Sequence, residues 1–541
     1  MRFLVAVVVC AFVPLGGQQT PTDEKKLCRL EGRTVNSVTG EAVRKVKLEL
    51  RRRVQESSPS WSATSDAEGK FAFEKVEPGT YLLGAEKTGY LQLTYGATSM
   101  RSGGTPLTLA PGQQMKDLQF KLIPQGVITG KVLDEDGEPV SGGTQITVLQ
   151  QRGRGGKPEF IAGESANDLG EFRLANLSPG RYFVCAQTWS YGREVPAKDE
   201  PEEGFVPTFY PGVTDQAGAS AVEVRAGQEA SGINITLRRA RLYRVSGKLA
   251  GLASGQSTRN MNISLTPRNR GGTTMFFGGS SGRVKPDGTF DIGHVRPGSY
   301  LLSAMVRADM MPQTIGRMPV EVGDSNVKDL VVTLFEPLRI SGSVRVEGDG
   351  KASPDGMRVM MLQADQEPVW SRPGMVGPDG AFKIDGIAPD KYFLNAFSLP
   401  EGTYLKSARA GKQEVLDEGL DLTEAQGAVS LELTLGTKPG AVEGMVRENT
   451  KPVPGSYVEL RPDPPRPAAR YLRKSGSADQ NGHFTIKDVA PGKYSAYAWR
   501  ENPGFDFLQD AEALKEVEGK AVKVTVEEGR SAAADLTPLP N

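Results

Sequence analysis

Histidine and cysteine are scarce in this chain, which has two and three of them among 541 residues. The two histidines, His294 and His483, lie far apart and fall in different copies of a repeated pattern. Zinc sites and Ser-His-Asp catalysis both need imidazole close to other functional side chains. The composition therefore argues against a metal site and a hydrolytic triad, and we expect no cofactor and no catalytic residue.

The chain also lacks an excess of charge of either sign, since 65 Lys and Arg balance 65 Asp and Glu. A balanced surface offers no long-range attraction to nucleic acid or to an acidic membrane. After the N-terminal segment, no apolar run reaches the roughly 20 residues that a membrane helix needs. We therefore expect no nucleic-acid partner and no transmembrane segment.

The N-terminal segment has the order of a secretory signal peptide. Met1 and Arg2 come first, an apolar stretch follows at residues 3–13, and small residues come after it. Such a segment is too short to span a bilayer and is removed on export. Val9 precedes Cys10 where a lipid-anchored protein needs a small residue, which disfavours a lipid anchor. We predict a signal peptide at 1–19 and a secreted or extracytoplasmic protein, in the periplasm or at the cell surface.

Two cysteines, Cys28 and Cys185, follow the signal segment and fall in different repeats. An oxidising compartment would permit a disulfide between them, but two cysteines are too few to serve as a disulfide framework. Two unpaired thiols are the favoured interpretation, and an inter-domain disulfide is the alternative.

One spacing occurs five times in the chain: a glycine, a phenylalanine two residues later, a tyrosine twelve later and an alanine sixteen later. The five sets are Gly69, Phe71, Tyr81 and Ala85; Gly170, Phe172, Tyr182 and Ala186; Gly288, Phe290, Tyr300 and Ala304; Gly380, Phe382, Tyr392 and Ala396; and Gly482, Phe484, Tyr494 and Ala498. The glycines lie 101, 118, 92 and 102 residues apart, which is the size of a small sandwich domain. The repetition predicts one small fold used five times.

Each repeat has the signature of short strands joined by tight turns. Apolar and polar residues alternate after the repeated glycine, as half-buried strands do. Turns such as Asn481-Gly482 are strong hairpin signals. Helical periodicity is confined to Asp510 to Val517. Six to eight short strands per repeat predict an all-β chain of Ig-like β-sandwiches.

The repeats divide the chain into five predicted sandwich domains. Their predicted boundaries are residues 27–123, 124–239 with a loop insertion at 190–220, 240–337, 338–438 and 439–541. The joins between them are short and contain proline, such as Pro124 and Pro337. Short proline-containing joins restrict the angle between neighbouring domains. We therefore expect a semi-rigid rod rather than a flexible string.

Four motifs recur in the repeats: an early Gly-x-Val strand, a Gly-x-Pro-Val turn, an Asp-x-x-Gly-x-Phe hairpin and a Pro-Gly-x-Tyr turn. In this combination the chain resembles the carboxypeptidase regulatory-like domain family, in five copies over nearly all of the mature sequence. The resemblance implies a transthyretin-like, seven-stranded sandwich. In the enzymes that carry this module it is an accessory to a separate catalytic domain, so the resemblance implies no peptidase activity. Related carbohydrate-binding-like sandwiches imply sugar binding as one possibility.

Aromatic residues outside the repeated framework are the candidate binding residues. Trp189 and Tyr191 follow the Tyr-to-Ala strand of the second repeat, and Trp499 follows that of the fifth. A loop is expected there, at one end of the sandwich, where such folds carry binding sites. Aromatic rings on exposed loops stack on sugar rings, whereas rings at the same place can also cap a domain junction.

Basic residues gather after the second strand in four of the five repeats. These segments contain Arg51, Arg52, Arg53, Arg152, Arg154, Lys157, Arg268, Arg270, Arg466, Arg470 and Arg473. If such loops line one side of the molecule they could meet an anionic polymer, whereas loops of this composition are commonly just solvated.

Three functions are compatible with this sequence. The leading hypothesis is a non-catalytic, secreted or surface-associated binding and spacer protein, because structural repeats use nearly the whole chain. The second is a carbohydrate-binding protein that uses the aromatic side chains of Trp189, Tyr191 and Trp499. The remote third is an enzyme with a site in the insertion at 190–220. The expected partner is a polysaccharide or a cell-surface protein.

Overall fold

The computed structural model describes residues 26–540 except 53–59, 101, 141–142, 151–157, 189–201, 253–256, 269–278, 309–310, 349–351, 365–372, 426, 467–468, 505–506 and 509–510. The predicted signal peptide at 1–19 lies outside the described residues. We call the successive groups of strands units 1 to 5 and define each by its elements below.

Unit 1 contains β1 (Cys28–Asn36), β2 (Lys47–Arg52), β3 (Ser60–Thr64), β4 (Lys70–Val76), β5 (Gly79–Glu86), β6 (Leu93–Thr94), β7 (Leu107–Leu109) and β8 (Gln114–Leu122). Unit 2 contains β9 (Gly126–Leu133), β10 (Thr144–Gln150), β11 (Glu159–Ser165), β12 (Glu171–Leu177), β13 (Gly180–Thr188), β14 (Glu202–Val206), β15 (Thr208–Phe209), η2 (Gln216–Gly218), β16 (Val222–Val224), β17 (Glu229–Ala230) and β18 (Ile235–Thr236). Unit 3 contains β19 (Arg238–Ala250), β20 (Met261–Pro267), β21 (Ser280–Arg283), β22 (Thr289–Val295), β23 (Gly298–Ala308), β24 (Met311–Val322) and β25 (Val327–Thr333).

Unit 4 contains β26 (Leu338–Val346), β27 (Arg358–Gln363), β28 (Gly374–Met375), β29 (Ala381–Ile387), β30 (Lys391–Phe397), β31 (Tyr404–Ala410), β32 (Gln413–Glu414), β33 (Leu420–Asp421) and β34 (Ala428–Gly436). Unit 5 contains β35 (Gly440–Met445), β36 (Arg447–Glu448), β37 (Lys451–Pro452), β38 (Tyr457–Pro462), η3 (Arg470–Leu472), β39 (Lys474–Ser477), β40 (His483–Val489), β41 (Gly492–Trp499), α2 (Ala511–Val517), η4 (Glu518–Lys520), β42 (Val522–Val526) and β43 (Ser531–Ala533).

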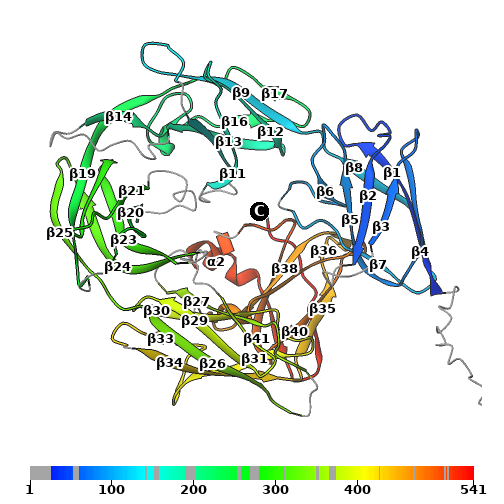
Figure 1. Cartoon of the computed structure of the whole chain (residues 1–541). Coiled ribbons are helices and arrows are strands. Elements are labelled where there is room, and N and C mark those ends of the chain that lie inside the picture. The colour runs from blue at the N-terminus through cyan, green and yellow to red at the C-terminus, as the bar shows by residue number, and fades with distance from the viewer. Residues whose placement is uncertain are drawn as a thin grey trace, which may run out of the picture.

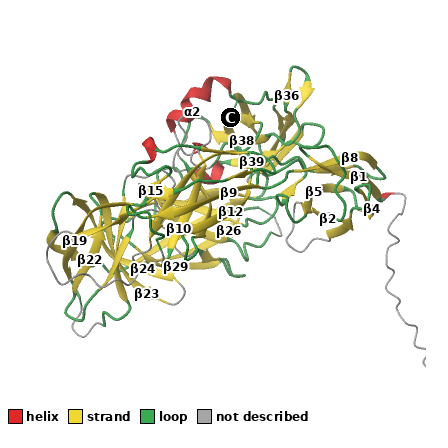
Figure 2. Ribbon diagram, turned by 90° about the horizontal axis from the view of Figure 1, so that it is seen from above, coloured by secondary structure: helices red, strands yellow, loops and turns green. Residues whose placement is uncertain are grey.

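Every unit is built around two β-sheets. Strands make up most of the regular structure of the described chain (Figure 2), which confirms the predicted all-β sandwich class. In unit 1 one sheet has the order β4-β1-β8 and the other the order β3-β2-β5-β6. The first strand of each unit pairs antiparallel with the strand of the repeated phenylalanine and parallel with a strand from the end of the unit. The predicted helical stretch is confirmed as α2.

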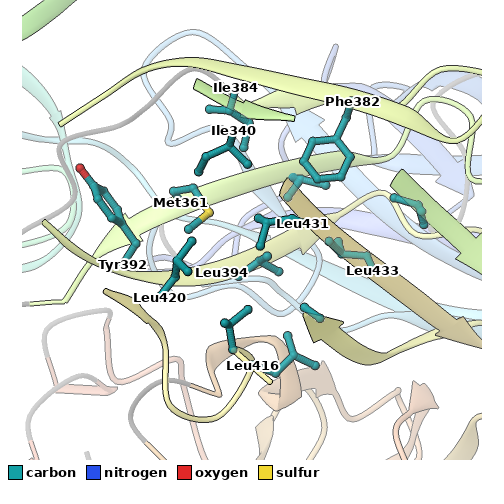
Figure 3. Close-up of a cluster of buried hydrophobic side chains, with 14 of the residues drawn as sticks. Ile340, Met361, Phe382, Ile384, Tyr392, Leu394, Leu416, Leu420, Leu431 and Leu433 are labelled. Carbon is teal, nitrogen blue, oxygen red and sulfur yellow. The ribbon is translucent and has the colours of Figure 1, made fainter. Parts of the chain in front are cut away.

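A cluster of buried apolar side chains lies between the two sheets of each unit in the described structure. In unit 4, Phe382 and Ile384 come from β29 and face Ile340, Met361 and Leu431 from three other strands (Figure 3). The repeated phenylalanine and tyrosine are buried in all five units, so the repeated spacing marks the core. The five domain boundaries that the sequence predicts remain a proposal.

The repeated tyrosine closes a turn in the same way in every unit. Its hydroxyl donates a hydrogen bond to the carbonyl four residues earlier, directly before the repeated proline. The five pairs are Tyr81 to Glu77 (2.7 Å), Tyr182 to Ser178 (2.6 Å), Tyr300 to Arg296 (2.9 Å), Tyr392 to Ala388 (2.8 Å) and Tyr494 to Ala490 (2.7 Å). This bond lets a tyrosine be buried with its polar end satisfied.

A glycine of the first strand lies opposite the repeated phenylalanine in each unit. In units 1, 2 and 4 the phenyl ring covers this glycine, and a Cβ on Gly342 would lie only 2.3 Å from the Phe382 ring. The backbone next to the parallel strand also approaches the glycine closely, since a Cβ on Gly444 would lie 1.8 Å from the carbonyl oxygen of Ala534. Only glycine fits this position, and the aromatic ring restores the burial that a side chain would have given.

A second framework position is not evident from the sequence alone. Four residues after the repeated phenylalanine, the backbone adopts a positive φ in every unit, at Lys75, Asn176, His294, Gly386 and Asp488. In each unit the pairing of this strand with the first strand shifts register close to it, so the position is a repeated β-bulge. His294 therefore occupies a framework position.

The units follow one another around a closed ring, and unit 5 lies beside unit 1 (Figure 1). The side chain of Gln480 in unit 5 hydrogen-bonds to Thr108 in unit 1, which confirms this contact. The predicted rod is therefore wrong. Short joins do restrict the angle between neighbouring units, but the restricted angles all turn the chain in one direction and bring its two ends together.

Specific contacts hold neighbouring units at these angles. The first part of β19 pairs with β14 of unit 2, and its second part pairs with β22 and β25 of unit 3. The Arg239 guanidinium lies 4.6 Å above the ring of Phe205 across this junction. Between units 4 and 5, Arg466 lies 2.8 Å from the carboxylate of Asp417.

The junction of units 3 and 4 uses a departure from the repeat. The residue after the repeated proline is glycine in four repeats and Asp390 in unit 4. Asp390 forms an ion pair with Arg317 of unit 3. A difference between the copies is thus used to join two of them.

Replacing Phe290 with alanine tests the assignment of the core. We expect a loss of about 3 to 5 kcal/mol in the stability of unit 3, because the change leaves a cavity. Hydrogen exchange resolved by unit should show lower protection in unit 3. The exposed Val331 in the same unit is the control, and Val331→Ala should change stability by less than about 0.5 kcal/mol. Unchanged protection in Phe290→Ala would contradict the assignment.

Candidate functional site

The face where the ring closes is the candidate site, because two distant segments build it together. Gln480 lies in the turn that precedes β40. Its side-chain oxygen accepts a hydrogen bond from the Thr108 N–H at 2.9 Å, and its side-chain nitrogen donates to the Thr108 carbonyl at 2.9 Å. The amide thus satisfies both main-chain groups of a residue in the short edge strand β7. We call this pair of bonds the latch.

The turn that carries Gln480 is held by a carboxylate. Asp479 Oδ1 accepts hydrogen bonds from the N–H groups of Asn481 and His483, at 2.8 and 3.0 Å. This carboxylate therefore holds the hairpin turn and, with it, the latch residue. Among the described residues, no group of three or more His, Cys, Asp or Glu could hold a metal ion.

Two further contacts join the units beside the latch. Thr98 of unit 1 donates a hydrogen bond from its hydroxyl to the Glu501 carboxylate of unit 5. Gly455 of unit 5 faces Thr105 so closely that a Cβ there would lie 2.6 Å from the threonine hydroxyl. The latch and the bond from Thr98 to Glu501 are polar, so hydrogen bonds contribute to the closure.

A cavity of about 180 Å³ lies between the two units at this closure. Its lining residues are Ser102, Gly103, Gly455, Tyr457, Ser475, Gly476, Ser477, Glu501 and Asn502. Two come from unit 1 and seven from unit 5, so the cavity exists only when the ring is closed. Hydroxyl groups, small residues and one carboxylate make the lining polar and leave main-chain atoms accessible.

Tyr457 lines the cavity and also contacts the face of the β38–β41 sheet that the segment around Leu508 covers. Its hydroxyl lies 3.3 Å from Glu459 Oε2, and Glu459 Oε1 lies 2.8 Å from Arg461. Glu459 is only 4% exposed, and burial raises its pKa. Burial is also the main cause that raises the pKa of Tyr457 to about 12, so the phenol keeps its proton at neutral pH.

The same network holds the segment before α2 against the sheet. Arg461 and Arg473 both donate to the carbonyl of Leu508. Burial, with the nearby charge of Arg461, lowers the pKa of Arg473 to about 10. The two arginines thus act as hydrogen-bond donors that fix a covering segment. For Arg473, which lies in one of the predicted basic segments, this is a structural role.

Trp499 does not match its predicted position. It is the last residue of β41 and is 0% exposed, so the prediction of an exposed loop ring is wrong. Its ring stacks on Tyr497 at 5.6 Å and contacts Phe507 edge to face at 6.2 Å. The strand extends one residue further than the repeat indicates, and the segment around Leu508 folds back over the indole.

Trp189 and Tyr191, the other two predicted binding residues, lie outside the described residues. The described end of the insertion forms β14 and β15. Because β14 extends the sheet of unit 3, this part of the insertion braces a junction.

The two described arginines of the first basic segment pair with carboxylates nearby. Arg51 lies 2.6 Å from Glu49, and Arg52 lies 3.2 Å from Glu77. Cys28 and Cys185 are both free and buried, which confirms the favoured interpretation of two unpaired thiols. None of the helices in the described part of the chain has the length and apolar character of a membrane span.

The fold makes this chain a tandem β-sandwich protein. Residues 29–122, which make up nearly all of its first unit, match the model of the carboxypeptidase regulatory-like domain family. This match confirms the resemblance for unit 1, and units 2 to 5 repeat its buried phenylalanine and tyrosine. No curated protein matches the chain.

Several solved structures resemble the chain at low identity. The Bacillus anthracis TIE protein is 10% identical, with 75% of this chain and 72% of that chain covered and a TM-score of 0.17. The minor pilin GBS52 of Streptococcus agalactiae is 12% identical, with 39% and 96% covered and a TM-score of 0.21. The major pilin subunit BcpA of Bacillus cereus is 11% identical, with 76% and 100% covered and a TM-score of 0.15. TM-scores this low give no guide to the arrangement of units here.

Removing the latch should loosen the ring. The double variant Gln480→Ala with Thr98→Val removes three hydrogen bonds, each worth about 0.5 to 1.5 kcal/mol. We expect faster hydrogen exchange at the Thr108 amide and a larger radius of gyration in small-angle scattering. Gln413→Ala, at an exposed strand residue of unit 4, is the control and should match the wild type. A double variant with wild-type exchange at Thr108 would show that the latch does not hold the closure.

Replacing Trp499 with alanine tests its structural role. The indole is fully buried among aromatic rings, so we expect a loss of about 3 to 5 kcal/mol in the stability of unit 5. Thermal unfolding and hydrogen exchange of β38 and β41 measure the change. The exposed Phe397 serves as the control, because Phe397→Ala removes an aromatic ring at little cost. Equal effects of the two changes would contradict the buried position of Trp499.

Proposed function

We propose that this chain is a non-catalytic, secreted or surface-associated binding protein made of five sandwich domains, with the boundaries predicted from the sequence. The observation that carries the proposal is the closure of the ring. Two segments that are hundreds of residues apart meet there and line one polar cavity. Sites for small molecules commonly form at such domain interfaces.

The surroundings of the two histidines support a binding protein over an enzyme. His294 occupies the repeated bulge, and its Nε2 lies 3.2 Å from the Glu202 carboxylate of β14, a strand that braces a junction. His483 is an exposed residue at the start of β40, beside the latch turn. Both positions have a structural explanation, whereas a general base needs a nucleophile or substrate proton within reach.

The closed ring favours binding over spacing. A spacer contributes length, because it separates what is attached to its two ends. Here unit 1 and unit 5 lie side by side, so five units add little distance between them (Figure 1). What the ring contributes instead is a fixed arrangement of loops from different units, which is the property that a binding surface needs.

Carbohydrate binding by Trp189 and Tyr191 stays a prediction, because both residues lie outside the described structure. Trp499 has no part in it, since the buried indole cannot meet a ligand. If the loop aromatics do bind a polysaccharide, Trp189→Ala should weaken binding roughly tenfold, with little change in melting temperature.

A paired screen tests the proposed function. The purified full chain is presented to a glycan array and to cell-envelope proteins, alongside the latch double variant and Gln413→Ala. We expect at least one partner that binds the wild type and Gln413→Ala and binds the latch variant more weakly. The absence of any partner for the wild type would contradict a binding function. A partner that binds the latch variant and the wild type equally well would show that its binding does not depend on ring closure.

A further inference from the structure

We propose that the cavity between units 1 and 5 binds a single sugar residue that carries no negative charge. This inference rests on the proposed binding function and names the ligand class and the place. A cavity of about 180 Å³ is smaller than the pockets that hold drug-sized ligands, which start at about 300 Å³. The cavity therefore suits one pyranose ring or the terminal residue of a chain.

The chemistry of the lining matches a ring of hydroxyl groups. Ser102, Ser475 and Ser477 bring hydroxyls, each of which can donate and accept a hydrogen bond. Ser475 and Ser477 are two residues apart on β39, so their side chains lie on the same face of the strand. Such groups can follow the alternating donors and acceptors of a sugar, which an apolar cavity could not.

One wall of the cavity is aromatic and is held in place. Tyr457 contributes to the lining, and its ring lies 6.2 Å from that of Trp499 with an interplanar angle of 42°. Its hydroxyl is bound to Glu459, as described above. A ring fixed at both its face and its hydroxyl loses little freedom when a ligand packs on it, which favours binding to the C–H face of a sugar.

The charge of the lining residues decides which charge the ligand can carry. Among the described lining residues, Glu501 is the one that carries a formal charge. It is oriented by the hydrogen bond from Thr98, and the Asn502 side chain beside it accepts a hydrogen bond from the Gly504 N–H at 2.9 Å. A fixed carboxylate accepts hydrogen bonds from sugar hydroxyls and repels an acidic sugar.

Gly103 allows a direct test of the site. Its backbone has no positive φ, and the nearest atom to a Cβ built there is the Ser477 hydroxyl at 3.8 Å. Gly103→Leu should therefore fold without strain and fill the cavity. Gly323 of unit 3 is the matched control, since a Cβ there meets nothing within 4 Å and its φ is not positive.

The experiment titrates the full chain with N-acetylglucosamine, glucosamine and glucuronate by NMR and calorimetry. We expect saturable binding of the neutral or cationic sugar with a Kd of about 1 mM, and at least tenfold weaker binding of glucuronate. Gly103→Leu should weaken binding at least tenfold, and Gly323→Leu should bind as the wild type does. Ser475→Ala with Ser477→Ala removes hydroxyls without filling space and should weaken binding about fivefold, which provides a second test if Gly103→Leu misfolds.

Several outcomes would overturn this inference. They are no saturable binding of any of the three sugars, preference for glucuronate, or wild-type affinity in both Gly103→Leu and the double serine variant. The proposed binding function fails separately, through the screen described above. If that screen finds a protein partner and the titration finds no sugar binding, the proposed binding function stands and the proposed sugar ligand is wrong.

Discussion

The hydrogen bond from the repeated tyrosine to the carbonyl before the repeated proline is the constraint on which each unit depends. A buried carbonyl without a partner would cost about 1 to 3 kcal/mol, so the tyrosine and the turn stabilise each other. Because its hydroxyl is hydrogen-bonded, the tyrosine ring has a fixed position between the two sheets. The phenylalanine that lies opposite the first-strand glycine fixes the other sheet in the same core. Each copy can therefore vary its loops while the sandwich stays the same.

The loops that vary are the ones that join the units. Asp390 stands where the other copies have glycine and pairs with Arg317 of the preceding unit. Gln480 stands at the tip of a framework hairpin and reaches unit 1. Both residues lie close to framework positions that recur in every unit. Polar residues that differ between the copies thus contribute to the shape of the ring, together with the strand pairing that joins units 2 and 3.

The fold could be predicted from the sequence because its signals are local and repeated. Alternation, hairpin turns and a fivefold spacing are enough to identify strands, turns and the buried ring of Phe290. The ring closure could not be predicted in this way, since the bond between Gln480 and Thr108 joins positions 372 residues apart. No periodicity relates such positions. The angles between neighbouring units add up over the whole chain, and their sum decides whether the chain forms a rod or a ring.

The candidate site shows the same limit. Trp499 was expected in a loop because the repeat ends at Ala498, but β41 includes one residue more and a later segment covers it. Tyr457, which lines the cavity, looks in the sequence like any alternating strand residue. The repeated bulge left a weak signal, since Asn176, Gly386 and Asp488 are residue types that adopt positive φ readily. Aligning the five copies at this position would have revealed it.

The strand shared between units 2 and 3 has a consequence for synthesis. β14 belongs to the insertion of unit 2, yet it pairs with the first part of β19, which leaves the ribosome later. Until Arg238 to Leu242 have emerged, the edge of β14 that pairs with β19 stays open. Domains of multidomain chains usually fold in order as they are made. In this chain the second unit can complete its fold only when the third has begun to appear, so translation through that boundary governs how long this edge of β14 stays unpaired.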